Sequence, residues 1–422
     1  MANSTEIKRQ FLHSLKRGTG EAYLIAKNNP EIDFSNQIIK GALNIFAYDG
    51  QSEGDRAIYI FDIISVSKQK DKIRKAILQG LLTEQNDTWN LTHLFALAEL
   101  YAQQNDTEAK QAIYNKFLNN PLRYSDWAGV DEILKLDGLN GLFFVAEEFG
   151  KRLKQNPDDW QDDLIISSFQ AENKQIKVYD ELKRKAKTNK FIRIYLDAIE
   201  KTQKRRENYS PEPTKQKDII DEILNSNPLH PFKGVFSLTE EEINQIAQQL
   251  ICETNNSNIE RFLNIFRFHK FPFESQLILN FAKQKRTSKN QIVENATEAL
   301  EFLSSKDIRN FAIDKIHSTK NPMSYLAILV SNYQNDDYKL LSEIANKTNN
   351  EDKIEQLAVI YTKIYTTNET KECKEPLEIL YNKMNCAIHR NEIVRILIKN
   401  EVLSDKIKDE IKFDCDLKTR KL

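Results

Sequence analysis

Apolar residues recur at helical spacing along most of the chain. Between residues 352 and 365 they fall at steps of three and four, which places them on one stripe of a helix. These positions are Ile354, Leu357, Ala358, Tyr361, Ile364 and Tyr365. Similar stripes begin near Leu91, Ile259 and Ile308. No segment shows the alternating pattern of a half-buried strand, so the sequence predicts an all-α fold.

The spacing of the helices also predicts how they pack. Beyond residue 239, helices are expected to start near 240, 256, 289, 305, 321, 337, 351, 373, 388 and 402. This is roughly 16 residues per helix and roughly 32 per hairpin. The first start carries Thr239 and Glu242 at the spacing of a capping box. A hairpin this short cannot bury its apolar face alone, so we expect an α-solenoid of stacked helical hairpins.

Proline and glycine divide the chain. Four of the ten prolines, at 211, 213, 228 and 231, lie in one short stretch, where they leave room for one short helix near residues 218–224. Ten of the eleven glycines lie within residues 1–150. We therefore expect an N-terminal helical-repeat region with glycine-containing turns at 1–206, a joint at 207–239, and a C-terminal helical-repeat region at 240–422.

Composition narrows the class of protein. The 61 Lys and Arg residues nearly balance the 62 Asp and Glu residues, so net charge favours no class of partner. A mean hydropathy of -0.59 is typical of a folded soluble chain. The longest apolar run, at 325–330, is too short to span a bilayer, and the N-terminus lacks the apolar stretch of a secretory signal. The four cysteines are scattered, which is typical of a reducing compartment. We expect a cytoplasmic protein without a membrane partner.

Two glycine-containing turns, at 17–22 and 48–56, carry the candidate binding residues. Their charged residues are Arg17, Glu21, Asp49, Glu53, Asp55 and Arg56, of which all but Asp55 are the candidates. Turns one hairpin apart recur on the same edge of a solenoid, so we expect these side chains to lie near each other. Trp89 and Trp127 add large amphipathic anchors of the kind that interfaces use. The prediction is a site for another protein or a peptide. The alternative is that the charges cap helices and pair with each other.

These two turns resemble those of uncharacterised bacterial HEAT-repeat proteins, and the resemblance runs through much of the chain. It implies a repeat fold and nothing catalytic. Asp307, Arg309 and Ala312 resemble the second helix of a HEAT repeat, as do Asp71, Arg74 and Ala76 with altered spacing. Residues 97–121 resemble a tetratricopeptide unit instead. Both repeat classes stay open, with HEAT-like packing preferred.

A basic stretch suggests a second kind of partner. Residues 183–206 contain ten basic and two acidic residues, a local charge of +8. Four of the basic residues are expected to face away from the apolar side of their helix: Lys190, Arg193, Lys201 and Lys204. Such a face neutralises phosphates, and HEAT-like folds include DNA glycosylases. The alternative function is therefore a nucleic-acid-binding or base-processing protein.

Cys386 and His389 are spaced to share one face of a helix, and Cys373 and Cys415 lie in the same terminal region. Together they would supply four zinc ligands, whereas the other interpretation is buried cysteines between helices. No sequence motif for binding nucleotides, dinucleotides or a catalytic metal occurs in the chain, and none for a serine nucleophile. We therefore name no catalytic residue and no cofactor. We expect a non-enzymatic scaffold or adaptor that binds another protein through the concave face of the solenoid and its N-terminal turns.

Overall fold

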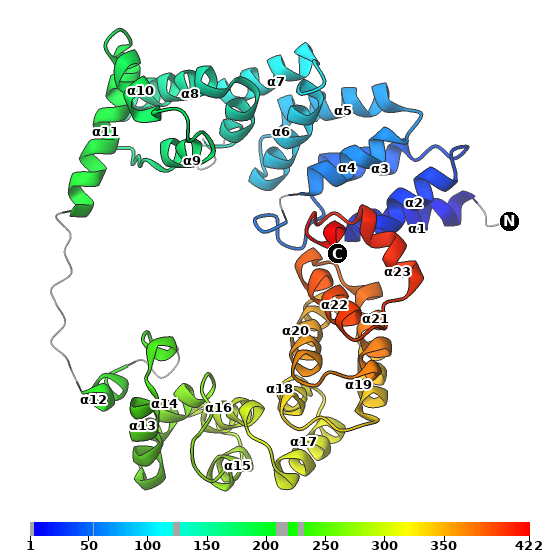
Figure 1. Ribbon diagram of the computed structural model, residues 1–422, viewed down its shortest axis with the longest axis vertical. Coiled ribbons are helices and arrows are strands. Elements are labelled where there is room, and N and C mark those ends of the chain that lie inside the picture. The colour runs from blue at the N-terminus through cyan, green and yellow to red at the C-terminus, as the bar shows by residue number, and fades with distance from the viewer. Residues whose placement is uncertain (1–3, 54, 121–126, 208–217, 227–231) are drawn as a thin grey trace. The chain divides into compact units, whose positions relative to one another are not determined.

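The computed structural model describes residues 4–53, 55–120, 127–207, 218–226 and 232–422. Within these ranges every regular element is an α-helix or a short 3-10 helix (Figure 1). The all-α prediction is therefore confirmed for the described residues. None of their helices is both long enough and apolar enough to cross a membrane.

The chain forms two compact units. The first comprises Met1–Glu212 together with Lys408–Leu422, and the second comprises Pro213–Ile407. The predicted joint at 207–239 is described only in part, because 208–217 and 227–231 lie outside the described residues, and all four of its prolines are among them. Its described part holds α12 (Ile219–Leu224), where the sequence left room for a short helix, and η2 (Val235–Ser237).

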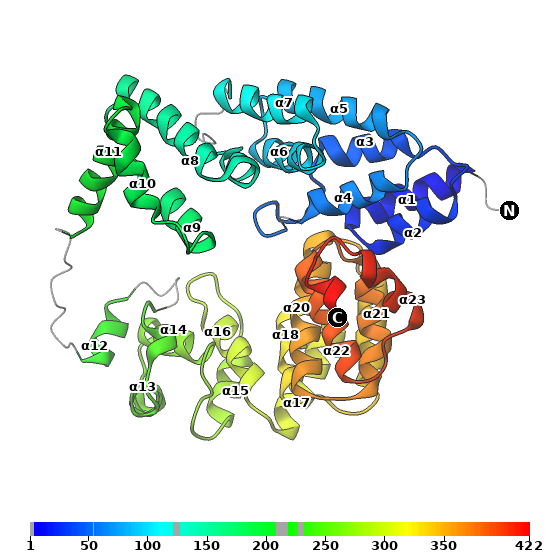
Figure 2. The same cartoon turned by 45° about the horizontal axis from the view of Figure 1, so that its top comes forward.

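In the first unit, helices pack against their first and second neighbours along the chain. The described helices are α1 (Ser4–Arg17), α2 (Gly20–Asn28), α3 (Ser35–Leu43), α4 (Arg56–Ser65), α5 (Lys70–Thr83), α6 (Thr88–Ala102), α7 (Thr107–Leu118), α8 (Val130–Gln155), α9 (Leu164–Glu172), α10 (Val178–Ala186) and α11 (Lys190–Glu207). Helix α1 contacts α2 and α3, and α5 contacts α6 and α7 (Figures 1 and 2). Stacked hairpins require this kind of contact. The solenoid itself stays a prediction.

The last fifteen residues belong to the first unit, an attachment that helical periodicity did not predict. They include η6 (Ile411–Phe413), which follows α23 (Asp405–Glu410), and η7 (Thr419–Lys421). The Cys415 amide donates a hydrogen bond to the Gly18 carbonyl at 2.9 Å, and Arg420 pairs with Asp62 at 2.7 Å. A Cβ on Gly20 would lie only 1.8 Å from the carbonyl oxygen of Glu410. The segment therefore packs directly against the start of α2.

The second unit continues with short helices. They are α13 (Glu240–Cys252), α14 (Asn256–Phe266), α15 (Gln276–Ala282), α16 (Ile292–Ala299), η3 (Leu300–Phe302), α17 (Lys306–Ser318), α18 (Met323–Ala327), η4 (Ile328–Val330), α19 (Asp337–Lys347), α20 (Glu351–Thr367), η5 (Lys371–Cys373), α21 (Lys374–Lys383) and α22 (Ala387–Lys399). Helices α18, α20 and α22 form one row, and α19 and α21 lie beside it (Figure 1).

The predicted helix starts agree with those of the second unit. Each expected start lies within one turn of an observed one. The capping box at α13 is confirmed, since Thr239 Oγ1 accepts from the Glu242 amide at 3.3 Å and Glu242 Oε2 accepts from the Thr239 amide at 2.7 Å. Helix α15 was missed because it has only seven residues and its apolar stripe is correspondingly brief.

Each of the two arginines compared with HEAT repeats links its helix to the second helix after it. Arg309 on α17 donates to both carboxylate oxygens of Asp337 at 2.8 Å, in the first turn of α19. Arg74 on α5 donates to Asp106 at 2.5 and 2.7 Å, at the residue that caps α7. Both pairs therefore fix one helix against the second helix after it. The assignment to a repeat class stays a prediction.

Candidate functional sites

A buried ion pair joins the second glycine turn to the end of α1. Glu53 Oε2 accepts from Arg56 Nε at 3.1 Å and Nη2 at 2.9 Å, and both side chains are almost completely buried. Arg56 also donates to the carbonyls of Lys16 at 3.0 Å and Arg17 at 3.3 Å, where helix carbonyls lack partners within the helix. Gly18 follows with a φ of 72°, and a Cβ there would lie 2.5 Å from Arg56 Nη1. Arg56 therefore caps the C-terminal end of α1.

The other charged residues of the first turn are also buried or hydrogen-bonded. The Arg17 side chain is buried, and Glu21 accepts a hydrogen bond from Ser14 Oγ at 2.5 Å. The structure thus brings the Glu53 and Arg56 side chains together at the Arg17 carbonyl, and all three residues are buried. This arrangement favours the alternative in which the charges pair with each other.

The second turn leaves an exposed aromatic surface, which we call the aromatic turn: Tyr48, Asp49, Gly50 and Trp89. Trp89 is 38% exposed and Tyr48 is 43% exposed. The turn rests on the indole, because a Cβ on Gly50 would lie 3.1 Å from Trp89 Cγ. Asp49 is exposed and accepts hydrogen bonds from Ser52 Oγ at 2.6 Å and the Gln51 amide at 2.9 Å. These bonds, that from Ser52 first, lower the pKa of the Asp49 carboxyl.

Trp127 is also exposed. It lies just before Gly129, which precedes α8 with a φ of 91° and has the Phe95 ring where a Cβ would be. Residues 121–126, which precede Trp127, lie outside the described residues. The structure therefore gives Trp127 an accessible ring but does not join it to the aromatic turn.

The basic face of α11 is exposed, as its helical pattern predicted. The apolar residues Ile192, Tyr195, Leu196 and Ile199 are buried, whereas Lys190, Arg193, Lys201 and Lys204 are exposed.

Two of these four cations also contact the protein. Lys190 Nζ lies 5.0 Å from the centre of the Phe191 ring. Arg193 Nη2 donates to the carbonyl of Ala186 at 3.0 Å, at the end of α10. The sequence interpretation, in which all four cations only face solvent, therefore needs correcting for Arg193. Replacing Arg193 would remove the hydrogen bond that its guanidinium donates to the last carbonyl of α10.

An exposed tryptophan lies beside the end of the basic face. Trp160 is 61% exposed, and the Arg206 guanidinium lies 5.3 Å from the centre of its ring. Arg206 also lies 3.5 Å from Asp162. A cavity of about 210 Å³ opens there, with Trp160, Lys201 and Arg205 among its lining residues. Asp158, Asp159 and Asp197 also line it, so its charge is mixed.

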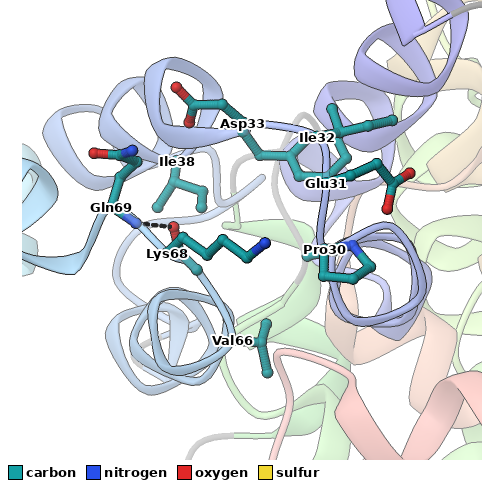
Figure 3. Close-up of a pocket in the computed structure, with 11 residues that line it drawn as sticks. Pro30, Glu31, Ile32, Asp33, Ile38, Val66, Lys68 and Gln69 are labelled. Atoms are coloured by element: carbon teal, nitrogen blue, oxygen red, sulfur yellow. Dashed lines mark hydrogen bonds between the residues drawn. The ribbon is translucent and has the colours of Figure 1, made fainter.

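Another cavity of the first unit, of about 140 Å³, lies between the connections α2–α3 and α4–α5 (Figure 3). Figure 3 shows the Lys68 side chain extending across it towards Pro30. None of the predicted binding residues lines this cavity. Its Asp33 carboxylate accepts from the Ser35 amide at 2.8 Å, a bond that lowers the pKa of Asp33.

In the second unit, Glu355, Cys386 and His389 form a compact cluster. Their potential ligand atoms lie within 4.8 Å of one another. His389 Nδ1 lies 2.6 Å from Glu355 Oε2, and hydrogen bonds from the imidazole to Cys386 and then to Glu355 raise the pKa of His389 to about 10. The zinc hypothesis had named Cys386 and His389. It missed Glu355, whose only signal in the sequence is an acid beside the apolar stripe of α20.

The two other cysteines of that hypothesis lie elsewhere. Cys415 packs against Gly18 in the first unit. Cys373 lies at the residue before α21 and is buried, and burial raises the pKa of its thiol to about 11. Neither belongs to the cluster found among the described residues.

Comparisons with known proteins give no relative from which a function could be transferred. No protein-family model, no curated protein and no solved structure matches this chain.

Proposed function

We propose that this chain is a non-enzymatic scaffold that binds another protein through the aromatic turn of its first unit. The observation that carries the proposal is the exposed indole of Trp89, held against the backbone of Gly50. An aromatic side chain fixed in place loses little conformational freedom on binding, and tryptophans are enriched among the residues that dominate binding energy.

The neighbouring groups support a protein partner. Tyr48 adds a second exposed ring, and Asp49 adds a carboxylate held by its own turn. A ring-rich centre with a polar rim is typical of protein interfaces. The buried charges Glu53 and Arg56 hold the turn from within and take no direct part in binding.

The test is recovery of partners from the native host, followed by affinity measurements with Trp89→Ala. Truncating a residue at the centre of an interface costs about 2 kcal/mol or more, which weakens binding by roughly 30-fold. Trp160→Ala is the matched control, because it removes an exposed indole from another surface. If both variants bind the partner like the wild type, the aromatic turn is not the binding surface.

The second candidate function, nucleic-acid binding, is favoured by the exposed basic face with Trp160 at its end. Cations neutralise the phosphates, and an exposed indole provides a surface on which bases stack. The acids Asp158, Asp159 and Asp197 in the same cavity oppose this binding.

A charge-reversal variant tests this candidate. Lys190, Lys201 and Lys204 are replaced by glutamate, while Arg193 is kept because it closes α10. Wild-type binding to single-stranded DNA should fall steeply with salt, and the variant should lose it without a change in thermal stability. Absence of wild-type binding at about 50 mM salt would exclude this function.

A further inference from the structure

Three metal-ligating side chains converge between two helices of the second unit. Glu355 lies on α20, Cys386 immediately precedes α22, and His389 lies in the first turn of α22. Helices α20 and α22 pack side by side (Figures 1 and 2). Residues more than thirty positions apart thus place a carboxylate, a thiol and an imidazole within 4.8 Å of one another.

We propose that Glu355, Cys386 and His389 bind one zinc-class divalent cation through one oxygen, one sulfur and one nitrogen atom. This donor set selects the metal. Mg²⁺ and Ca²⁺ take oxygen ligands, whereas Zn²⁺ accepts thiolate, imidazole and carboxylate in one site. The proposal concerns a site separate from the aromatic turn and goes beyond the scaffold function.

The carboxylate is already oriented for binding. Glu355 Oε1 accepts a hydrogen bond from the Cys386 amide at 3.1 Å, which leaves Oε2 directed at His389 Nδ1, 2.6 Å away. Metal-ligating groups are commonly held by a further hydrogen bond of this kind. The bond between Oε1 and the amide persists when Oε2 binds the cation, so it supports a ligand that binds through one oxygen.

Binding requires the carboxylate and the imidazole to move slightly apart. Two ligand atoms about 2.1 Å from a tetrahedral zinc ion stand roughly 3.4 Å apart. The Oε2 to Nδ1 separation of 2.6 Å therefore has to widen by somewhat less than one ångström. The cation takes the place of the proton between them, and the thiol of Cys386 releases its proton to become a ligand.

Three protein ligands leave one position of a tetrahedral zinc site unfilled. Zinc prefers four ligands, and sites with three protein ligands keep the fourth position for water. Glu355 and Cys386 are buried, whereas the His389 side chain is 24% exposed. Solvent therefore reaches the cluster at its imidazole.

The site is tested on the full chain with Co²⁺ as the probe, followed by competition with Zn²⁺. Co²⁺ bound by a thiolate gives a charge-transfer absorption that carboxylate and imidazole sites lack. We expect one equivalent of Co²⁺ to give this band and one equivalent of Zn²⁺ to remove it. A wild-type chain that binds neither ion, or binds Co²⁺ without the band, overturns the proposal.

Matched variants locate the site. Removing a group that only supports a metal ligand weakens binding by about 10- to 100-fold, so Cys386→Ser and His389→Gln should weaken it by more than 100-fold. Cys252→Ser and His317→Gln are the controls, because both residues are exposed elsewhere in the same unit. Unchanged binding in folded His389→Gln, or loss of the band in Cys252→Ser, overturns the assignment even if Cys386→Ser fails to fold.

Discussion

Replacing Glu53 separates a structural role from a binding role for the charged turns. The Glu53 carboxylate is buried against Arg56, and the same guanidinium holds the last carbonyls of α1. Glu53→Ala leaves the Arg56 charge buried without its carboxylate. Glu53→Gln keeps the shape of the side chain and removes only the charge.

The magnitude follows from the burial of both partners. Breaking a buried pair by removing one partner costs about 3–5 kcal/mol, since the remaining charge keeps its desolvation penalty. For a unit of about 200 residues, 1 kcal/mol shifts the melting temperature by about 2–4 °C. Glu53→Ala should therefore lower the melting temperature by roughly 6–20 °C.

The assay is calorimetric unfolding of the full chain, with Asp49→Ala as the control from the same turn. Asp49 is exposed, and its side chain accepts hydrogen bonds from Gln51 and Ser52 of its own turn, so its replacement should barely move the transition. A shift below about 2 °C for both Glu53 variants would refute the reasoning, because a buried pair cannot be removed at so small a cost.

Three further changes test other contacts. Gly20→Ala places a methyl group against the Glu410 carbonyl and should release the C-terminal segment, which is measured as faster amide exchange at residues 411–422. Burial raises the pKa of Glu132 to about 7. The buried side chain therefore stabilises the fold fully when it is protonated, below the usual pKa of a glutamate. This stabilisation is lost as the pH rises through 7 and the carboxyl ionises. Glu132→Gln should therefore match the wild type in urea unfolding near pH 4.5 and exceed it by up to about 3 kcal/mol at pH 8. Arg309→Lys loses the bidentate hydrogen bonds to Asp337 and should lower the free energy of unfolding by about 1–3 kcal/mol in the same measurement. An unchanged midpoint would show that a single positive charge is enough to hold Asp337.

Local features of the fold followed from the sequence because they depend on near neighbours. The stripe beginning at Ile192 predicted which side of α11 is buried, and Thr239 with Glu242 predicted where α13 starts. Both depend on residues three or four positions apart, and a helix brings these together wherever it lies.

Contacts between distant residues did not follow from the sequence. The turns carrying Arg17 and Glu53 looked like exposed binding elements, yet both side chains are buried. Arg56 and Gly18 determine this arrangement by a contact across 38 positions of the chain. Polar residues are mostly exposed, so their burial becomes visible only when their partners are known.

The cluster at Glu355 shows how much of a site a sequence can reveal. Cys386 and His389 were recognised because helical spacing places them on one face, whereas the third member comes from a different helix. Cys373 and Cys415 were the nearest candidates in the sequence, but the helices bring the Glu355 carboxylate within 4.8 Å of the Cys386 thiol instead. This exchange changes the chemistry: four-ligand thiolate-rich sites are closed and structural, whereas a site with one sulfur, one nitrogen and one oxygen ligand keeps a position open. If Co²⁺ binds here, exchange of its bound water, rather than the melting temperature alone, is the property to measure next.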